Sequence, residues 1–124
     1  MDVIIVEDDP STGEIYTRAL ERKGFTSTLI TRGDEAVSYF ENKASIIPKL
    51  VILDVNLPGN SGLYILRFLR QKLKLTDLKI IVSSANSLAK DAPEMTLADR
   101  FLAKPCSPRA LVEVVQGLLD GVVE

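Results

Sequence analysis

Five short apolar runs, most of them rich in β-branched residues, alternate along the chain with stretches that have helical spacing. The runs are Val3–Val6, Thr28–Ile30, Leu50–Leu53, Ile80–Val82 and Arg100–Ala103. Strands that alternate with helices are typical of βαβ units, and continuously apolar strands are typical of a parallel sheet covered on both faces. The sequence therefore predicts a five-stranded α/β domain. A length of 124 residues suits one domain over residues 1–124 and is too short for two ordinary ones.

Between these runs, apolar side chains recur three and four residues apart. This spacing predicts helices over Ser11–Lys23, Asp34–Asn42, Gly62–Lys74 and Pro108–Leu119. Pro10 near the start of the first helix and Gly24 at its end are residues that favour those positions. The stretch Ser87–Asp99 is the weakest helix candidate because Pro93 falls inside it. We expect a short, broken or mobile element there.

The composition excludes several classes of protein. The net charge is −2 and the basic residues are scattered, so direct binding of DNA or RNA is not expected. The absence of histidine excludes a Ser-His-Asp or Cys-His catalytic group and any zinc site that needs histidine. The single cysteine, Cys106, cannot form an internal disulfide and is interpreted as a bystander thiol. The start of the chain, MDVIIVEDD, is neither a signal peptide nor a membrane span, so we expect a cytoplasmic protein with no membrane partner.

Polar side chains follow four of the predicted strands directly. They are Glu7, Asp8 and Asp9 after the first, Asp54 after the third, Ser83 and Ser84 after the fourth, and Lys104 and Pro105 after the fifth. Ligands of such sheets bind beyond the carboxyl ends of the strands, so these groups converge if their strands are neighbours. Clustered carboxylates repel one another unless a cation lies among them. Oxygen ligands favour a hard cation, and we expect Mg²⁺, with Mn²⁺ as a substitute.

The same residue types suit phosphoryl transfer. An ionised aspartate beside Mg²⁺ is a poor base but a workable nucleophile toward phosphorus. The metal can hold one phosphoryl oxygen, Lys104 a second and the Ser84 hydroxyl a third. The sequence thus points to chemistry on a phosphoryl group.

Four segments in this order carry a family resemblance: IIVEDDP, LVILDVNLPGNSG, KIIVSSA and FLAKP. Along essentially its whole length the sequence resembles the receiver domain of two-component response regulators. The resemblance implies a flavodoxin-like, doubly wound parallel sheet of (βα)5 topology with strand order 2-1-3-4-5. It also implies a phosphorylation-dependent signalling switch and not an enzyme, apart from limited self-phosphorylation and autodephosphorylation.

The resemblance assigns roles at the acidic end of the site. Asp54 is similar to the aspartate that receives a phosphoryl group from a histidine kinase or a histidine phosphotransfer protein. Asp8 resembles a direct metal ligand, as does Asp54, whereas Glu7 would act mostly through water. Asn56 would contribute its backbone carbonyl to the metal.

Further positions resemble the residues that read the phosphoryl group. Ser84 matches the hydroxyl position, Lys104 the phosphate-pairing lysine, and Pro105 would follow a cis peptide bond. Phe101, three residues before Lys104, stands at the aromatic switch position. Two neighbouring residues have simpler interpretations: Asp9 as a helix N-cap and Ser83 as a residue that bonds or packs within its strand.

Two other classes remain as alternatives. A haloacid-dehalogenase-like, Mg²⁺-dependent phosphohydrolase also uses a strand-end aspartate, but it would need a second aspartate where this chain has Asn56. A flavodoxin-like FMN binder shares the strand pattern, but it would need a phosphate loop where this chain has acidic residues. Both fit the sequence less well than a receiver.

The output of the switch is left open. The last five residues, DGVVE, are too short for an effector domain, so we expect either a stand-alone receiver or a receiver cut from a longer chain. The last predicted helix carries a wide apolar stripe, which predicts either a partner or homodimer surface or a frayed tail. Its members are Leu111, Val112, Val114, Val115, Leu118, Leu119, Val122 and Val123.

Overall fold

A single parallel sheet in the order β2-β1-β3-β4-β5 forms the centre of the computed structural model. The structure describes residues 1–123, and side-chain surroundings for residues 1–120. The strands are β1 (Val3–Val6), β2 (Ser27–Ile30), β3 (Leu50–Asp54), β4 (Lys79–Ser84) and β5 (Arg100–Ala103). The predicted α/β class and the strand order implied by the family resemblance are both confirmed.

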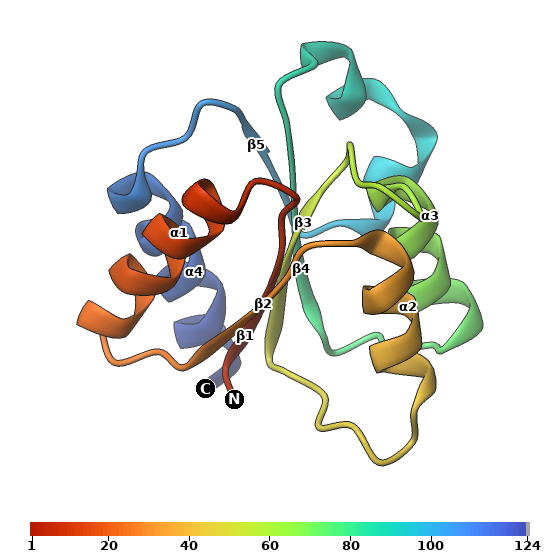
Figure 1. Cartoon of the computed structure of the whole chain (residues 1–124), viewed down its shortest axis with the longest axis horizontal. Coiled ribbons are helices and arrows are strands. Elements are labelled where there is room, and N and C mark those ends of the chain that lie inside the picture. Colours follow the sequence, from red (N-terminus) through yellow and green to blue (C-terminus); the bar gives the residue numbers. More distant parts are fainter. Residues whose placement is uncertain (124) are drawn as a thin grey trace.

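Four α-helices cover the sheet. They are α1 (Pro10–Arg22), α2 (Gly33–Glu41), α3 (Gly62–Arg67) and α4 (Pro108–Val123). Figure 1 shows α1 and α4 on one face of the sheet and α2 and α3 on the other. Two apolar clusters, one on each face, form the core. The last helix runs beyond the predicted end at Leu119, and the side chains of Val122 and Val123 lie outside the described part of the chain.

The continuous apolar runs are explained by this layering. Along β1, Val3 and Ile5 pack with α1 and α4, whereas Ile4 and Val6 pack with α2 and α3. Successive side chains of a strand point to opposite faces, so a strand buried on both sides must be apolar at every position. The edge strand β5 is only partly buried, in keeping with its single neighbour, β4.

The helix predicted over Gly62–Lys74 changes its winding partway. After α3, the residues Phe68–Lys72 form a π-helical turn, η1, in which the amide of Leu73 donates to the carbonyl of Phe68 at 3.0 Å. The chain then leaves the helix through Lys74, whose φ is +56°. Periodicity alone could not show this change, because the apolar spacing of three and four residues suits either winding.

The connection from β4 to β5 contains two short 3₁₀ turns, η2 (Ser87–Asp91) and η3 (Pro93–Leu97), and no α-helix among its residues. The expected short, broken element is confirmed. Ala92 between the turns has extended backbone angles, because a residue before proline is driven out of the helical region. Neither turn contains a buried residue.

One stability prediction follows from the glycines. In α4, a Cβ added to Gly117 would meet no atom within 4 Å, so Gly117→Ala should raise the free energy of unfolding by about 0.5–1 kcal/mol. Gly24 has equally open surroundings, but its φ is +86°, so Gly24→Ala should instead lower that free energy by about 1–2 kcal/mol. Urea denaturation would measure both. A destabilised Gly117→Ala variant would contradict the free space seen on α4.

Candidate functional site

The carboxyl ends of β1, β3, β4 and β5 meet at one edge of the sheet. Asp54, the last residue of β3, is in register with Ser83 of β4, and Ser84 is in register with Ala103 of β5. The amide of Lys104 donates to the carbonyl of Ser84 at 2.9 Å, which joins the chain after β5 to the end of β4. The predicted convergence of the strand ends is therefore observed.

Three carboxylates form the acidic part of this edge. Oxygen atoms of Glu7, Asp8 and Asp54 lie within 4.8 Å of one another. Glu7 and Asp54 are only 3% and 5% exposed, whereas Asp8 is exposed to solvent. Each follows or ends a buried strand, so the rigid sheet holds the carboxylates close together despite their mutual repulsion.

Lys104 connects two of these carboxylates. Its Nζ donates to Oε1 of Glu7 at 2.7 Å and to Oδ2 of Asp54 at 2.9 Å. Burial alone would lower the pKa of Lys104, but the hydrogen bonds to Glu7 and Asp54 outweigh it and raise that pKa. The lysine is therefore charged at neutral pH and partly neutralises the acidic group.

The pKa of Glu7 is also raised. Desolvation by burial is the largest cause, and it outweighs the hydrogen bonds from Lys104 and from the amide of Asp9. One ammonium group serves two carboxylates, so the site keeps an excess of negative charge after the ion pairs are counted. That excess would favour a bound cation.

The second oxygen of Asp54 faces its own loop. The amide of Asn56 donates to Oδ1 of Asp54 at 3.1 Å, and Asn56 is exposed at the mouth of the site. The loop then returns against the strand end: a Cβ on Gly62 would lie 2.1 Å from the carbonyl oxygen of Asp54. Only glycine permits this approach, which explains the glycine that starts α3.

The three remaining predicted site residues, Ser84, Phe101 and Pro105, lie on β4, on β5 and directly after Lys104. Ser84 is buried, and its Oγ accepts from the amide of Asn86 at 3.0 Å. Phe101 is partly buried and packs against the apolar cluster under α2 and α3. The peptide bond between Lys104 and Pro105 is cis, as the family resemblance implies.

Asp9 and Ser83 have the simpler roles that the sequence predicts for them. Asp9 is the N-cap of α1, where its carboxylate accepts from the amide of Ser11 at 3.2 Å and from the hydroxyl of Thr12 at 2.6 Å. The hydrogen bond from Thr12 is the largest cause of the lowered pKa of Asp9. Ser83 is buried within β4.

One contact near the site was not predicted. The hydroxyl of Tyr16 in α1 donates to the carbonyl of Cys106, two residues after Lys104. Tyr16 is one of the buried residues of α1, and nothing in its spacing along the sequence indicates a partner 90 residues away.

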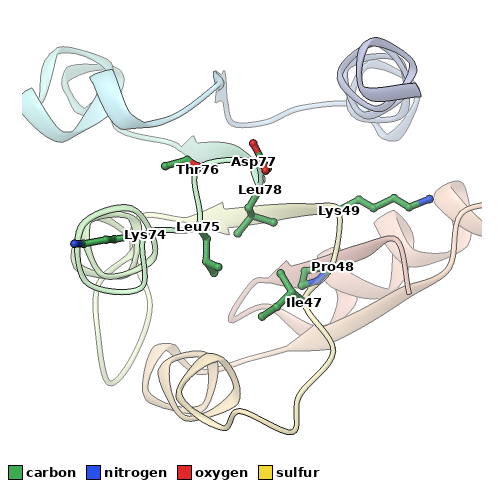
Figure 2. Close-up of a pocket in the computed structure, with 8 residues that line it drawn as sticks. All are labelled: Ile47, Pro48, Lys49, Lys74, Leu75, Thr76, Asp77 and Leu78. Carbon is green, nitrogen blue, oxygen red and sulfur yellow. The ribbon is translucent and has the colours of Figure 1, made fainter. Parts of the chain in front are cut away.

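A separate cavity of about 330 Å³ lies at the opposite ends of β3 and β4, lined by residues 47–49 and 74–78. Figure 2 shows Ile47, Leu75 and Leu78 at this cavity, while the side chains of Lys49 and Lys74 extend away in opposite directions. The cavity adjoins the start of β3 and Asp54 is the last residue of that strand. It therefore does not belong to the acidic site.

The acidic site fits a hard divalent cation. Three carboxylates converge, two of them buried, and Lys104 does not balance their charge. Carboxylate and carbonyl oxygens are the ligands that Mg²⁺ prefers. Glu7, Asp8 and Asp54 could hold it, with the carbonyl of Asn56 as a further donor.

Fold and site together define an α/β protein with an acidic, lysine-containing site at the carboxyl ends of its parallel strands. The model of the response regulator receiver domain matches residues 3–116, and the chain belongs to this family. It is thus a receiver domain of a response regulator, a signalling protein of two-component systems.

Individual relatives support this family membership. The transcriptional regulatory protein BaeR of Escherichia coli O6:H1 is 32% identical over 94% of this chain and 47% of its own length. The phosphate regulon regulator PhoB of Rhizobium meliloti is 34% identical over 94% of this chain and 51% of its own length. The chain spans about half the length of these curated relatives. The structure of response regulator TrrA of Thermotoga maritima with Mg²⁺-BeF is 32% identical, with a TM-score of 0.83 over 95% of this chain and 99% of TrrA.

The comparisons also argue against one of the two alternative classes of protein. They do not support a haloacid-dehalogenase-like phosphohydrolase, because the family match and the relatives are response regulators. The same match favours a receiver over an FMN binder.

Among the described residues, no helix is both long enough and apolar enough to cross a membrane.

Proposed function

We propose that Asp54 is the phosphoryl acceptor of this receiver. The observation that carries the proposal is the position of Lys104, whose ammonium bonds both Asp54 and Glu7 within a buried acidic group. Asp54 ends a strand buried on both faces, so its carboxylate has a rigid support. Transfer of a phosphoryl group depends mainly on such positioning and on neutralisation of charge.

The surrounding residues would divide the phosphoryl oxygens between them. Mg²⁺, or Mn²⁺ in its place, would supply charge neutralisation when bound by Glu7, Asp8, Asp54 and the Asn56 carbonyl. Lys104 is already within hydrogen-bond distance of Asp54 and would pair with a second oxygen. The Ser84 hydroxyl would bond a third after leaving the amide of Asn86.

Phosphorylation would then act as a switch. A phosphoryl group adds negative charge and strong acceptor oxygens at the end of β3. Movement of Ser84 toward it would change the start of the β4–β5 connection, and Phe101 on the neighbouring strand would follow. The economical description is an equilibrium between two states that phosphorylation biases. The surface that changes would include η2, η3, β5 and α4, and Pro105 would aim Lys104 at the site.

The partners follow from this role. A histidine kinase or a histidine phosphotransfer protein would supply the phosphoryl group, and an output protein or effector domain would read the changed surface. BaeR and PhoB are transcriptional regulators about twice as long as this chain. We interpret residues 1–124 of this chain as one receiver domain. We propose a cytoplasmic receiver that makes no direct contact with nucleic acid. The partly buried Val114 and Leu118 of α4 would suit a homodimer or an output contact.

Acetyl phosphate with Mg²⁺ tests the proposal directly. The protein should gain the mass of one phosphoryl group, and peptide mapping should place that group on the segment containing Asp54. Chelation of the metal by EDTA should reduce the phosphorylation rate at least tenfold, because the acidic group would then repel the anionic donor. Intact-mass spectrometry measures both results. Equal rates with and without the metal would contradict the assigned role of the carboxylates.

A further inference from the structure

A buried tyrosine links α1 to the loop that carries Lys104. The ring of Tyr16 belongs to the apolar cluster between the sheet and the helices α1 and α4. Its hydroxyl donates to the carbonyl of Cys106 at 3.1 Å. Cys106 is two residues beyond Lys104, so this bond reaches the loop next to the residue that contacts Asp54.

The loop over residues 104–107 is anchored at both ends by hydrogen bonds. At its start, the amide of Lys104 donates to the carbonyl of Ser84. At its end, the hydroxyl of Ser107 accepts from the amide of Ala110 and the carbonyl of Ser107 accepts from the amide of Leu111, both in the first turn of α4. The Tyr16 hydroxyl holds the stretch between these two anchors. It is contributed by an element that lies 90 residues away in sequence.

Phenylalanine has the same ring as tyrosine and would pack equally well at position 16, so packing does not explain the Tyr16 hydroxyl. A buried hydroxyl costs free energy unless it makes a hydrogen bond, so its presence in an apolar cluster points to the bond itself. Burial also raises the pKa of Tyr16, which keeps the hydroxyl protonated as a donor.

The loop also has room to move when this bond is lost. A cavity of about 390 Å³ opens beside it, lined by Ile15 and Tyr16 of α1 and by Lys104, Pro105 and Cys106 of the loop, among others. Packing leaves this side of the loop open, so the Tyr16 hydrogen bond adds to the packing of Cys106 and to the hydrogen bonds of Lys104 in limiting the movement of the loop.

We propose that Tyr16 is a positioning residue for phosphoryl acceptance, and that its hydroxyl holds the backbone from which Lys104 reaches Asp54. The inference rests on the proposed role of Asp54. It assigns to Tyr16 an effect on recognition of the phosphoryl donor through Lys104. The carboxylates of Glu7, Asp8 and Asp54 are not on this loop, so binding of the metal should change much less.

Tyr16→Phe separates these effects. The variant should need about three- to tenfold more acetyl phosphate for half-maximal phosphorylation rate, which corresponds to one lost hydrogen bond. Its Mg²⁺ affinity, measured by isothermal titration calorimetry, should stay within about twofold of that of the unmodified protein, because the carboxylates keep their positions on the strands. Tyr39→Phe is the matched control, because the Tyr39 hydroxyl also donates to a carbonyl, that of Ile46, in the loop before β3. This control should leave both quantities unchanged.

Hydrogen exchange gives a readout that needs no phosphoryl transfer. The amides of Lys104, Cys106 and Ser107 should exchange faster in Tyr16→Phe than in the unmodified protein, while those of α1 should not. Unchanged exchange in this loop would overturn the inference. So would an unchanged requirement for acetyl phosphate, or a parallel loss of Mg²⁺ affinity and stability. Failure of the unmodified protein to become phosphorylated would instead overturn the proposed role of Asp54.

Discussion

Asp54→Asn should abolish phosphorylation of the protein by acetyl phosphate and Mg²⁺. The amide has nearly the shape of the carboxylate but lacks its negative charge, so it cannot act as the nucleophile toward phosphorus. The fold should survive, because asparagine fills the same space and its one side-chain oxygen can still accept one of the two hydrogen bonds that Asp54 receives, from Lys104 or from the amide of Asn56. Intact-mass spectrometry should therefore detect no phosphorylated species in a folded variant.

Asp77→Asn is the matched control for this experiment. Asp77 is exposed and lines the cavity at the opposite ends of β3 and β4. The same chemical change at that position should leave the phosphorylation rate unaltered. A phosphorylated Asp54→Asn variant would show that another residue accepts the group and would remove the basis of the proposed function.

Arg70→Ala should cause the largest loss of stability that we expect from a single charged side chain. Arg70 lies in η1 and its side chain is only 12% exposed. Its guanidinium donates to the carbonyls of Leu75, Leu78 and Leu97, and to the carboxylate of Asp99 at 2.9 Å. One side chain thus joins the end of η1, the start of β4 and the segment before β5.

The loss should be about 3 kcal/mol in the free energy of unfolding. Alanine would leave three carbonyls without this donor and would leave Asp99 without its cation. Asp99 also accepts from the amide of Ile80 at 2.8 Å, so the damage would extend into β4. Urea denaturation would measure the change, provided that the transition remains two-state.

Two further variants sharpen this test. Arg18→Ala removes an exposed arginine whose single ion pair within the described part of the chain is with Glu14 on the surface of α1, and it should cost less than about 0.5 kcal/mol. Arg70→Lys keeps the charge but loses the planar fork of donors, so it should fall between the two alanine variants. A loss below about 1 kcal/mol for Arg70→Ala would mean that the fork of hydrogen bonds contributes little.

Much of the architecture could be predicted because burial leaves a local record in the sequence. The apolar runs from Val3 and from Leu50 are continuous, since both of their faces are covered, and the predicted ends of α1 and α2 lie within one residue of those observed. The order of the strands came from the family resemblance and not from the runs themselves. The π-helical turn of η1 was missed because its apolar spacing matches that of an ordinary helix.

By itself the sequence determined the class of sheet and the residues that end its strands, because strand length, apolar periodicity and turn residues are local properties. Only the tertiary structure decided which side chains meet. The ammonium of Lys104 lies between Glu7 and Asp54, which are 97 and 50 residues away, and Tyr16 bonds a carbonyl 90 residues away. Such contacts depend on which strands are neighbours and how the helices pack on them. The periodicity of a single segment carries no information about either.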